Sequence, residues 1–270
     1  MSTHPVFRFG PAILFCPADR PERYAKALDR ADAVILDLED AVAPDAKHAA
    51  RLALVSTPLD PDRVIVRVNP SGGDAFADDL AALAATDYRT VMLAKCEGTA
   101  DLVDLADFEV IALCETAKGV LAAPEIAAIP NVSALMWGAE DLVASLGGSS
   151  SRAADGSYRE VARYSRSHVL LAAGAHGIAA IDAVHLDLAD VDGLRDEAED
   201  AAAVGFAATA CIHPAQVEVV RAAYRPSPDR IEWARSVLEA ARGERGVFAF
   251  RGAMVDAPLL AQAEAVLRRA

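Results

Sequence analysis

The sequence is poor in features that mark several other classes of protein. It has four cysteines in 270 residues, far apart in the chain and with no C-x-x-C pair, namely Cys16, Cys96, Cys114 and Cys211. This spacing argues against a zinc knuckle and indicates reduced, buried thiols, as in a cytosolic protein. The sequence also has no G-x-G-x-x-G fingerprint and no G-K-[ST] loop. It therefore lacks the motifs by which nucleotide-binding open sheets are recognised.

Positive charge and long apolar runs are scarce as well. The chain carries 26 Lys and Arg against 40 Asp and Glu, a net charge of −14. This balance disfavours nucleic acid or an anionic membrane as a partner. Residues 1–10 have no signal-peptide character, and the most apolar window, residues 169–184, is broken by His176 and Asp182. We therefore expect no membrane span and a cytoplasmic location.

Short apolar segments alternate with segments of helical length. With 53% hydrophobic residues, the chain can bury a large core, and a single α/β domain is the simplest reading. Eight segments have strand character: residues 12–16, 33–38, 63–68, 90–94, 110–114, 132–137, 179–184 and 207–212. Ala-rich helical segments lie between them, for example residues 74–85, 117–128, 158–175 and 194–204. The pattern predicts a closed (β/α)8 TIM barrel, with a doubly wound open sheet as the alternative.

The pattern changes after the eighth strand. Residues 214–224 read as a helix, 225–228 as a stiff linker and 229–241 as a further helix, followed by a short apolar segment, a turn and a last helix over about 258–269. A barrel does not need this appendix in order to close. We therefore predict a barrel domain over residues 1–224 and a helical extension over 225–270, which packs on its own barrel or reaches over a neighbour.

Charged residues gather where the predicted strands end. They are Asp37, Glu39, Asp40, Arg67, Lys95, Glu97, Glu115 and Asp141. In a barrel these ends converge on one mouth. Carboxylates on two adjacent strands, with no His partner, suit Mg²⁺ better than Zn²⁺. Arg67 interrupts an apolar strand and should face a carboxylate of the protein or of a substrate. The alternatives are that single acids cap helices and that Arg67 forms a structural bridge with Asp37 or Glu39.

Six ordered motifs carry a family resemblance. They are LFCPADRP (residues 14–21), ILDLEDAV (35–42), VRVN (66–69), LCET (113–116), WGAEDL (137–142) and CIHPAQ (211–216). The sequence resembles the citrate lyase β-subunit-like branch of the HpcH/HpaI aldolase family, whose relatives are malyl-CoA and citramalyl-CoA lyases. The resemblance extends to the appendix, where residues 252–258 read GAMVDAP. It implies a (β/α)8 barrel that assembles as a homotrimer or hexamer.

The resemblance also assigns roles to single residues. It implies Mg²⁺ held by Glu115 and Asp141, and an oxo-acid held by Arg67. It places coenzyme A against Arg20 and Lys26, with His213 and Pro214 on the same edge, and counts Ala139 and Glu140 among the substrate contacts. Asp256 matches an acid that the carboxyl-terminal extension of a neighbouring subunit lends to the site as a lid. We assign Asp37 and Glu39 to orienting Arg67 and the water around the metal.

The expected chemistry follows from charge. The resemblance implies reversible cleavage of a 3-hydroxyacyl-CoA of the malyl-, citramalyl- or citryl-CoA type into acetyl-CoA or propionyl-CoA and a small oxo-acid. Metal and Arg67 would stabilise the alkoxide, and Asp256 would act as the base in the synthetic direction. Hydrolysis of the thioester could follow. The alternatives are the β subunit of a carrier-protein-dependent citrate lyase, a free 2-oxo-acid class II aldolase and a non-catalytic barrel.

Overall fold

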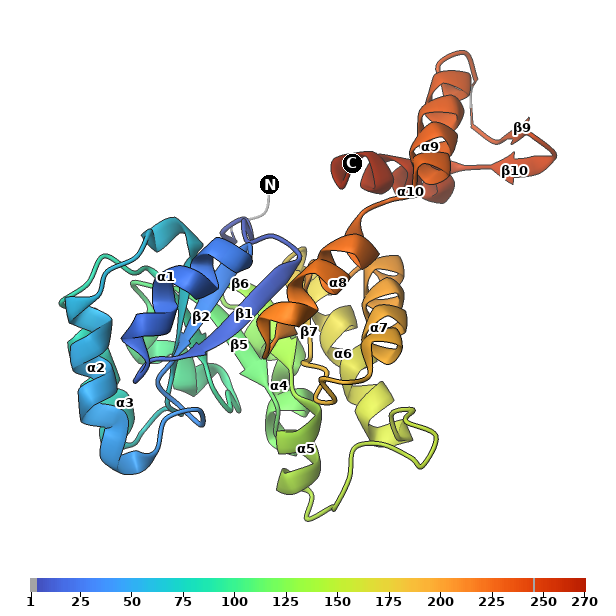
Figure 1. The fold of residues 1–270 in the computed structure, drawn as a ribbon. Coiled ribbons are helices and arrows are strands. Elements are labelled where there is room, and N and C mark those ends of the chain that lie inside the picture. The colour runs from blue at the N-terminus through green and yellow to red at the C-terminus, as the bar shows by residue number, and fades with distance from the viewer. Residues whose placement is uncertain (1–3, 245) are drawn as a thin grey trace. The chain divides into compact units, whose positions relative to one another are not determined.

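The eight predicted strands form a closed parallel barrel, in a computed structural model that describes residues 4–244 and 246–270. The strands are joined in chain order, and the last pairs with the first: β1 Ala12–Pro17, β2 Ala33–Asp37, β3 Val64–Val68, β4 Thr90–Leu93, β5 Glu109–Cys114, β6 Val132–Trp137, β7 Ala179–Asp182 and β8 Ala208–Cys211. Helices lie outside the ring of strands (Figure 1). The (β/α)8 prediction is confirmed, and the doubly wound open sheet is wrong.

The connecting helices largely follow the prediction. They are α1 Pro21–Arg30, α2 Lys47–Ser56, α3 Asp74–Leu83, α4 Ala117–Ala127, α5 Ala139–Ser145, α6 Glu160–His176, α7 Val191–Val204 and α8 Pro214–Tyr224. Helix α7 begins three residues before the predicted start because Asp190 caps it, its side chain accepting a hydrogen bond from the Gly193 amide. Between β4 and β5 the chain forms a 3₁₀ helix, Thr99–Leu105, in place of an α-helix.

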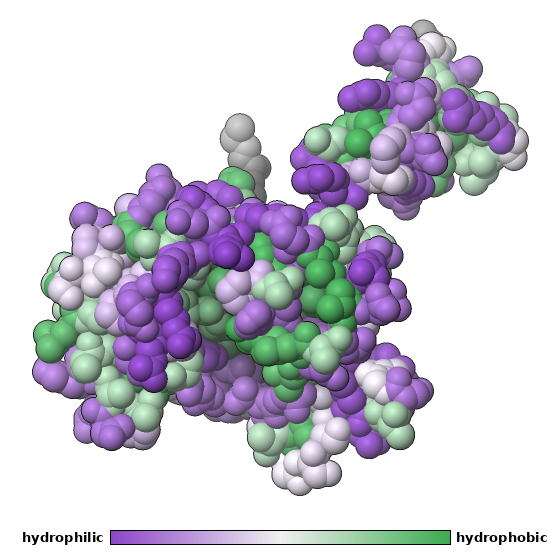
Figure 2. Space-filling model, in the orientation of Figure 1, coloured by the Kyte–Doolittle hydropathy of each residue, from purple (hydrophilic) through white to green (hydrophobic). Residues whose placement is uncertain are grey.

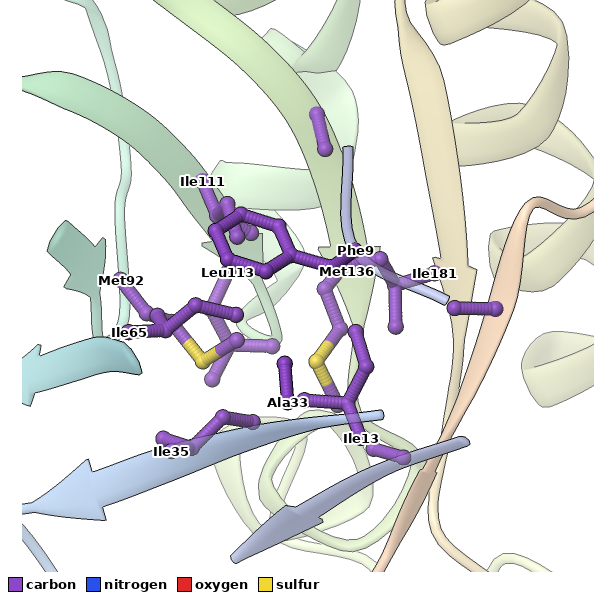
Figure 3. Packing of buried hydrophobic residues seen from close by; sticks show 13 residues of the cluster. Phe9, Ile13, Ala33, Ile35, Ile65, Met92, Ile111, Leu113, Met136 and Ile181 are labelled. Atoms are coloured by element: carbon purple, nitrogen blue, oxygen red, sulfur yellow. The ribbon is translucent and has the colours of Figure 1, made fainter. Parts of the chain in front are cut away.

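Aliphatic side chains from alternate strand positions fill the barrel. Successive residues of a strand point to opposite faces, so every second residue faces the barrel axis. The inward set forms one buried cluster (Figure 3) that comprises Ile13, Ala33, Ile35, Ile65, Met92, Ile111, Leu113, Ala134, Met136, Ile181, Ala208 and Ala210, with Phe9 from the segment before β1. The interior is therefore a packed core, and chemistry is confined to the strand ends.

The carboxyl-terminal residues form a separate compact unit, residues 221–270, and residues 1–220 form the other. Helix α8 runs across this division. The second unit consists of helices α9 (Pro228–Ala241) and α10 (Ala257–Arg268) and the antiparallel strands β9 (Phe248–Phe250) and β10 (Ala253–Val255). Its own core contains Ala234, Val237, Val255 and Ala263. The turn at residues 251–252 closes a two-stranded hairpin, so the extension contains a small sheet besides its helices.

Hydrophilic residues cover much of the surface shown in Figure 2, as the charge composition predicts. All four cysteines are buried and free, in agreement with the sequence analysis. Among the described residues, none of the helices has both the length and the apolar character required to cross a bilayer.

Candidate active site

Strand alternation brings three charged residues to the mouth of the barrel. Asp37 follows the inward-facing Ile35 by two positions, and Arg67 and Glu115 stand in the same relation to Ile65 and Leu113. A spacing of two keeps a side chain on the same face of a strand. All three charges therefore point inward, one pleat beyond the apolar core, where barrel enzymes have their active sites.

Arg67 is held by two carboxylates and an aromatic ring. Its Nε donates to Asp37 Oδ1 at 2.7 Å, and its Nη2 donates to Asp37 Oδ2 at 2.6 Å. Its Nη1 lies 3.1 Å from Glu39 Oε2, and the guanidinium carbon lies 4.9 Å from the centre of the Phe15 ring. Asp37 and Arg67 are also register partners across β2 and β3. Bidentate pairing of this kind fixes the plane and direction of the guanidinium.

Asp37 and Glu39 also organise the turn that follows β2. Asp37 accepts hydrogen bonds from the backbone amides of Glu39 and Ala41, at 2.9 and 3.1 Å. Burial raises the pKa of Glu39, although Arg67 and Lys95 oppose the change. Both acids are nearly inaccessible to solvent. Through these contacts they hold Arg67 and the turn in place.

Glu115 and Asp141 lie on the far side of the same mouth, on neighbouring segments. Glu115 directly follows β5, and Asp141 lies in the first turn of α5, which follows β6. Burial raises the pKa of Glu115 to about 8, with a further contribution from the negative charge of Asp141. Repulsion of this kind between a buried and a half-exposed carboxylate is relieved when a cation binds between them.

The local backbone is built for the Glu115 carboxylate. At Gly138 a Cβ atom would lie 2.7 Å from Glu115 Oε2, so with any residue other than glycine the carboxylate or the turn after β6 would have to shift. Thr116 caps α4, since its side chain accepts from the Gly119 amide at 3.0 Å, and its hydroxyl donates to Glu97 at 2.9 Å. These contacts fix the turns on both sides of the acid.

A cavity of about 230 Å³ opens between these groups. Its lining includes six of the predicted site residues, which are Asp37, Arg67, Glu115, Ala139, Glu140 and Asp141. Its apolar wall contains Phe15, Leu113, Met136, Val184, Leu186 and Ile212. The Ser151 hydroxyl donates to Glu140 Oε1 at 2.5 Å, which ties the loop before α6 to this wall. The cavity can therefore hold a small anion beside an apolar group.

The remaining predicted residues lie elsewhere. Arg20 and Lys26 are exposed, just before and within α1. Pro214 begins α8, and His213, which directly precedes it, lines a separate small cavity with Gln216. Asp256 lies in the second unit, where its side chain caps α10 by accepting from the Leu259 amide at 3.3 Å. Within the barrel unit, Arg20, Lys26 and His213 are not part of the wall of the main cavity.

Sequence reasoning assigned no role to several residues that support the site. The Lys95 ammonium contacts Glu39 and lies 3.0 Å from Asp40 Oδ2 and 3.4 Å from Asp141 Oδ1. Beneath the cavity, Trp137 Nε1 donates to Asp182 Oδ1 at 2.6 Å, and Asp182 also binds Arg166 at 2.8 Å. In the sequence, Lys95 was recognisable only as one of the charged residues that follow a predicted strand. The partners of Asp182 are distant in sequence and gave no signal.

The donor atoms fit a hard cation that retains water or substrate oxygens. Glu115 and Asp141 offer carboxylate oxygens, while within residues 4–244 and 246–270 no cluster of three or more His, Cys, Asp or Glu forms a complete metal cage. Mg²⁺ is typically bound by one or two carboxylates, with the remaining positions filled by water and substrate. Zinc sites use more protein ligands and favour nitrogen and sulfur.

Comparison with known proteins yields consistent matches over most of the chain. A family model described as HpcH/HpaI aldolase/citrate lyase matches residues 12–214. A citrate lyase subunit beta-like protein of Mycobacterium tuberculosis is 62% identical over 261 residues, which cover 97% of this chain and 96% of that protein. A (3S)-malyl-CoA thioesterase of Cereibacter sphaeroides is 37% identical, and the match covers 91% of this chain and 89% of that protein. A mitochondrial citramalyl-CoA lyase of Mus musculus is 32% identical, and the match covers 95% of this chain and 84% of that protein.

Solved structures match as well. The crystal structure of the protein CitE from Mycobacterium tuberculosis in complex with magnesium, acetoacetate and coenzyme A superposes with a TM-score of 0.93 at 62% identity. The match covers 97% of this chain and 98% of that one.

Proposed function

Because the chain belongs to the HpcH/HpaI aldolase/citrate lyase family, which includes lyases, we propose that it is a Mg²⁺-dependent carbon–carbon lyase acting on a 3-hydroxyacyl-CoA. The products are acetyl-CoA or propionyl-CoA and a small oxo-acid. The observation that carries this proposal is the cavity in which Arg67, Glu115 and Asp141 face one another at the mouth of the barrel. The complex of the CitE relative with magnesium, acetoacetate and coenzyme A supports it.

Glu115 and Asp141 would hold the metal, since their carboxylates meet at one side of the cavity. When bound, Mg²⁺ supplies a Lewis acid that lowers the cost of negative charge on the oxygen of the oxo-acid. Burial of Glu115 strengthens its interaction with a cation, because the low local dielectric screens the charges less than water does. The exposed side of Asp141 faces the open cavity.

Arg67 would bind the carboxylate of the oxo-acid. Asp37 and Glu39 already orient its guanidinium, and Phe15 packs against it, so little conformational freedom is lost when an anion binds. A fixed cation of this kind stabilises charge that develops on the departing oxo-acid. The apolar wall opposite it accommodates hydrogen or a methyl group on the same acid.

The reaction moves one proton from oxygen to carbon. In cleavage the 3-hydroxyl group loses its proton, the C2–C3 bond breaks, and its electron pair passes to the thioester enolate. The enolate then takes up a proton at carbon to give the acyl-CoA. Asp256 is our candidate for that transfer, and in synthesis it removes the proton from the acyl-CoA. It belongs to the second unit, so in the proposed homotrimer or hexamer the partner subunit's Asp256 would complete the site.

Coenzyme A would extend along the rim. Arg20 and Lys26 present exposed positive charges just before and within α1, and His213 directly precedes α8, which begins at Pro214. Phosphate groups of the coenzyme require such cations at the surface, while the thioester reaches the cavity. Thioester hydrolysis after condensation is the second candidate function, because a relative at 37% identity is a (3S)-malyl-CoA thioesterase.

The test is a coupled assay of the purified protein with Mg²⁺, acetyl-CoA or propionyl-CoA, and a panel of glyoxylate, pyruvate, oxaloacetate and acetoacetate. We expect a hydroxyacyl-CoA product that requires metal and is lost in Asp141→Ala. Asp192→Ala, at an exposed acid in the first turn of α7, is the control and should be fully active. Release of free thiol after condensation would identify hydrolysis. If no oxo-acid of the panel gives a product while Mg²⁺ still binds, the result would favour a carrier-protein-dependent citrate lyase subunit or a free 2-oxo-acid aldolase.

A further inference from the structure

Lys95 contacts acids on several sides of the barrel mouth at once. It follows β4, and its ammonium pairs with Glu39 after β2, lies 3.0 Å from Asp40 Oδ2 and 3.4 Å from Asp141 Oδ1 in α5. Its side chain is 29% exposed, so water screens these pairs only in part. One ammonium group therefore joins the side of the mouth that orients Arg67 to the side that carries Asp141.

The backbone of Lys95 makes a separate contact with the second proposed metal ligand. Its φ of +49° lies in the left-handed region, which a lysine adopts only when the surrounding structure requires it. In this conformation the Lys95 amide donates to Glu115 Oε1 at 3.2 Å. Lys95 thus touches Glu115 through its main chain and Asp141 through its side chain.

The charges of the site explain why a lysine stands at this position. Arg67 directs Nε and Nη2 to Asp37 and Nη1 to Glu39, so its positive charge is largely balanced by the acids at the end of β2. Glu115 and Asp141 repel each other on the opposite side. The ammonium of Lys95 lies against Asp141 and so occupies the neighbourhood in which a divalent cation would otherwise bind with little competition.

We propose that Lys95 is a positioning residue that serves as an internal counter-ion of the metal site, competing with Mg²⁺ for Asp141 while its amide holds Glu115. This inference rests on the proposed function. Because two cations repel each other at short range, the bare protein binds Mg²⁺ weakly. An oxo-acid brings a carboxylate that offsets the extra positive charge, so metal and substrate bind cooperatively.

The experiment measures Mg²⁺ affinity by titration calorimetry, with and without pyruvate, for the wild type and four variants. Lys95→Met and Lys95→Gly remove the ammonium, and the glycine keeps the left-handed backbone without strain. Lys95→Arg keeps the charge. Lys118→Met is the matched control, because Lys118 is exposed and pairs with Glu97 at 3.3 Å.

We expect Lys95→Met and Lys95→Gly to bind Mg²⁺ about tenfold more tightly than the wild type in the absence of pyruvate. The enhancement of metal binding by pyruvate should shrink in both. Lys95→Arg and Lys118→Met should behave as the wild type. Unchanged or weaker Mg²⁺ binding in Lys95→Gly, with its melting temperature preserved, would overturn the inference and leave Lys95 with a structural role alone.

The same variants separate this inference from the proposed reaction. A wild type that turns over hydroxyacyl-CoA, together with Lys95 variants of unchanged Mg²⁺ affinity, would leave the function standing and remove the counter-ion role. Tighter Mg²⁺ binding in the Lys95 variants, with no turnover of any hydroxyacyl-CoA by the wild type, would support the counter-ion role and remove the reaction. Absence of Mg²⁺ binding in all variants would overturn both.

Discussion

Gly138 and Glu115 approach so closely that a Cβ atom at position 138 would lie 2.7 Å from Glu115 Oε2 and 3.0 Å from Glu115 Cβ. Both contacts are shorter than a packed interior tolerates without movement. The Glu115 carboxylate therefore packs directly against the backbone of the turn between β6 and α5. Any side chain at position 138 must displace one of them.

Substitution Gly138→Ala should move the Glu115 carboxylate. We expect a loss of about 1–3 kcal/mol in the free energy of unfolding, because the added methyl group overpacks the site. Mg²⁺ binding should weaken by about tenfold or more, as when the groups that orient metal ligands are disturbed. Gly174→Ala in α6 is the control, since nothing lies within 4 Å of its new Cβ, and it should be neutral or stabilise the fold by about 0.5–1 kcal/mol. Wild-type Mg²⁺ affinity in Gly138→Ala would show that Glu115 tolerates displacement.

Removal of Arg166 should destabilise the barrel strongly. Its guanidinium is the charge partner of the buried Asp182, with Nη2 2.8 Å from Oδ2. Arg166→Met leaves that carboxylate without a cation, at an expected cost of about 3–5 kcal/mol in chemical denaturation. Arg163→Met on the same helix breaks only an exposed pair with Glu160 and should cost less than about 0.5 kcal/mol. Equal losses in the two variants would contradict the central place of the Asp182 pair.

The free energy of unfolding should depend on pH through Glu115. Burial and then Asp141 raise the pKa of this carboxyl to about 8 in the folded state, above the ordinary value of 4.5. Between these values the folded chain keeps a proton that the unfolded chain releases, so the contribution of Glu115 to stability falls as pH rises. In metal-free buffer, wild type should lose stability relative to Glu115→Gln between about pH 5 and about pH 9. A difference that does not change with pH would contradict this.

The cysteines should resist alkylation in the native protein. Burial raises the pKa of Cys16 to about 11 and that of Cys96 to about 12, and raises the pKa of Cys114 as well. Thiolate is the reactive form, so labelling by iodoacetamide at about pH 8 should be slow until denaturant is added. Mass spectrometry of the labelled peptides checks this. Rapid native labelling at any one of the four would contradict this and show local opening around that cysteine.

The strands and the acids at their ends were predictable because both depend on local pattern. Short apolar runs that end on a charge place Asp37 and Glu115 at strand ends whatever the rest of the chain does. The partner of Arg67 stayed open between Asp37 and Glu39, since the choice depends on the register of β2 and β3. The structure shows that Arg67 binds both.

What the sequence could not provide depends on the three-dimensional arrangement. The contacts of Lys95 with Glu39 and Asp40 join residues more than fifty positions apart, and its left-handed backbone has no signature in a lysine. The Asp182–Arg166 pair likewise requires the packing of α6 on the barrel. The β9–β10 hairpin consists of strands of three residues, too short for periodicity to identify.

The alternation that separates the aliphatic core from the charged mouth also sets which genetic changes the chain can survive. Ile35 and Asp37, like Leu113 and Glu115, share a face only because a single residue lies between them. A single codon inserted within β2 or β5 would turn the acid outward and an outward-facing residue inward, so both chemistry and packing would be lost together. Insertions in the connecting loops leave this alternation intact. Such barrels should therefore diversify by changes in loop length, while their strands evolve by substitution alone.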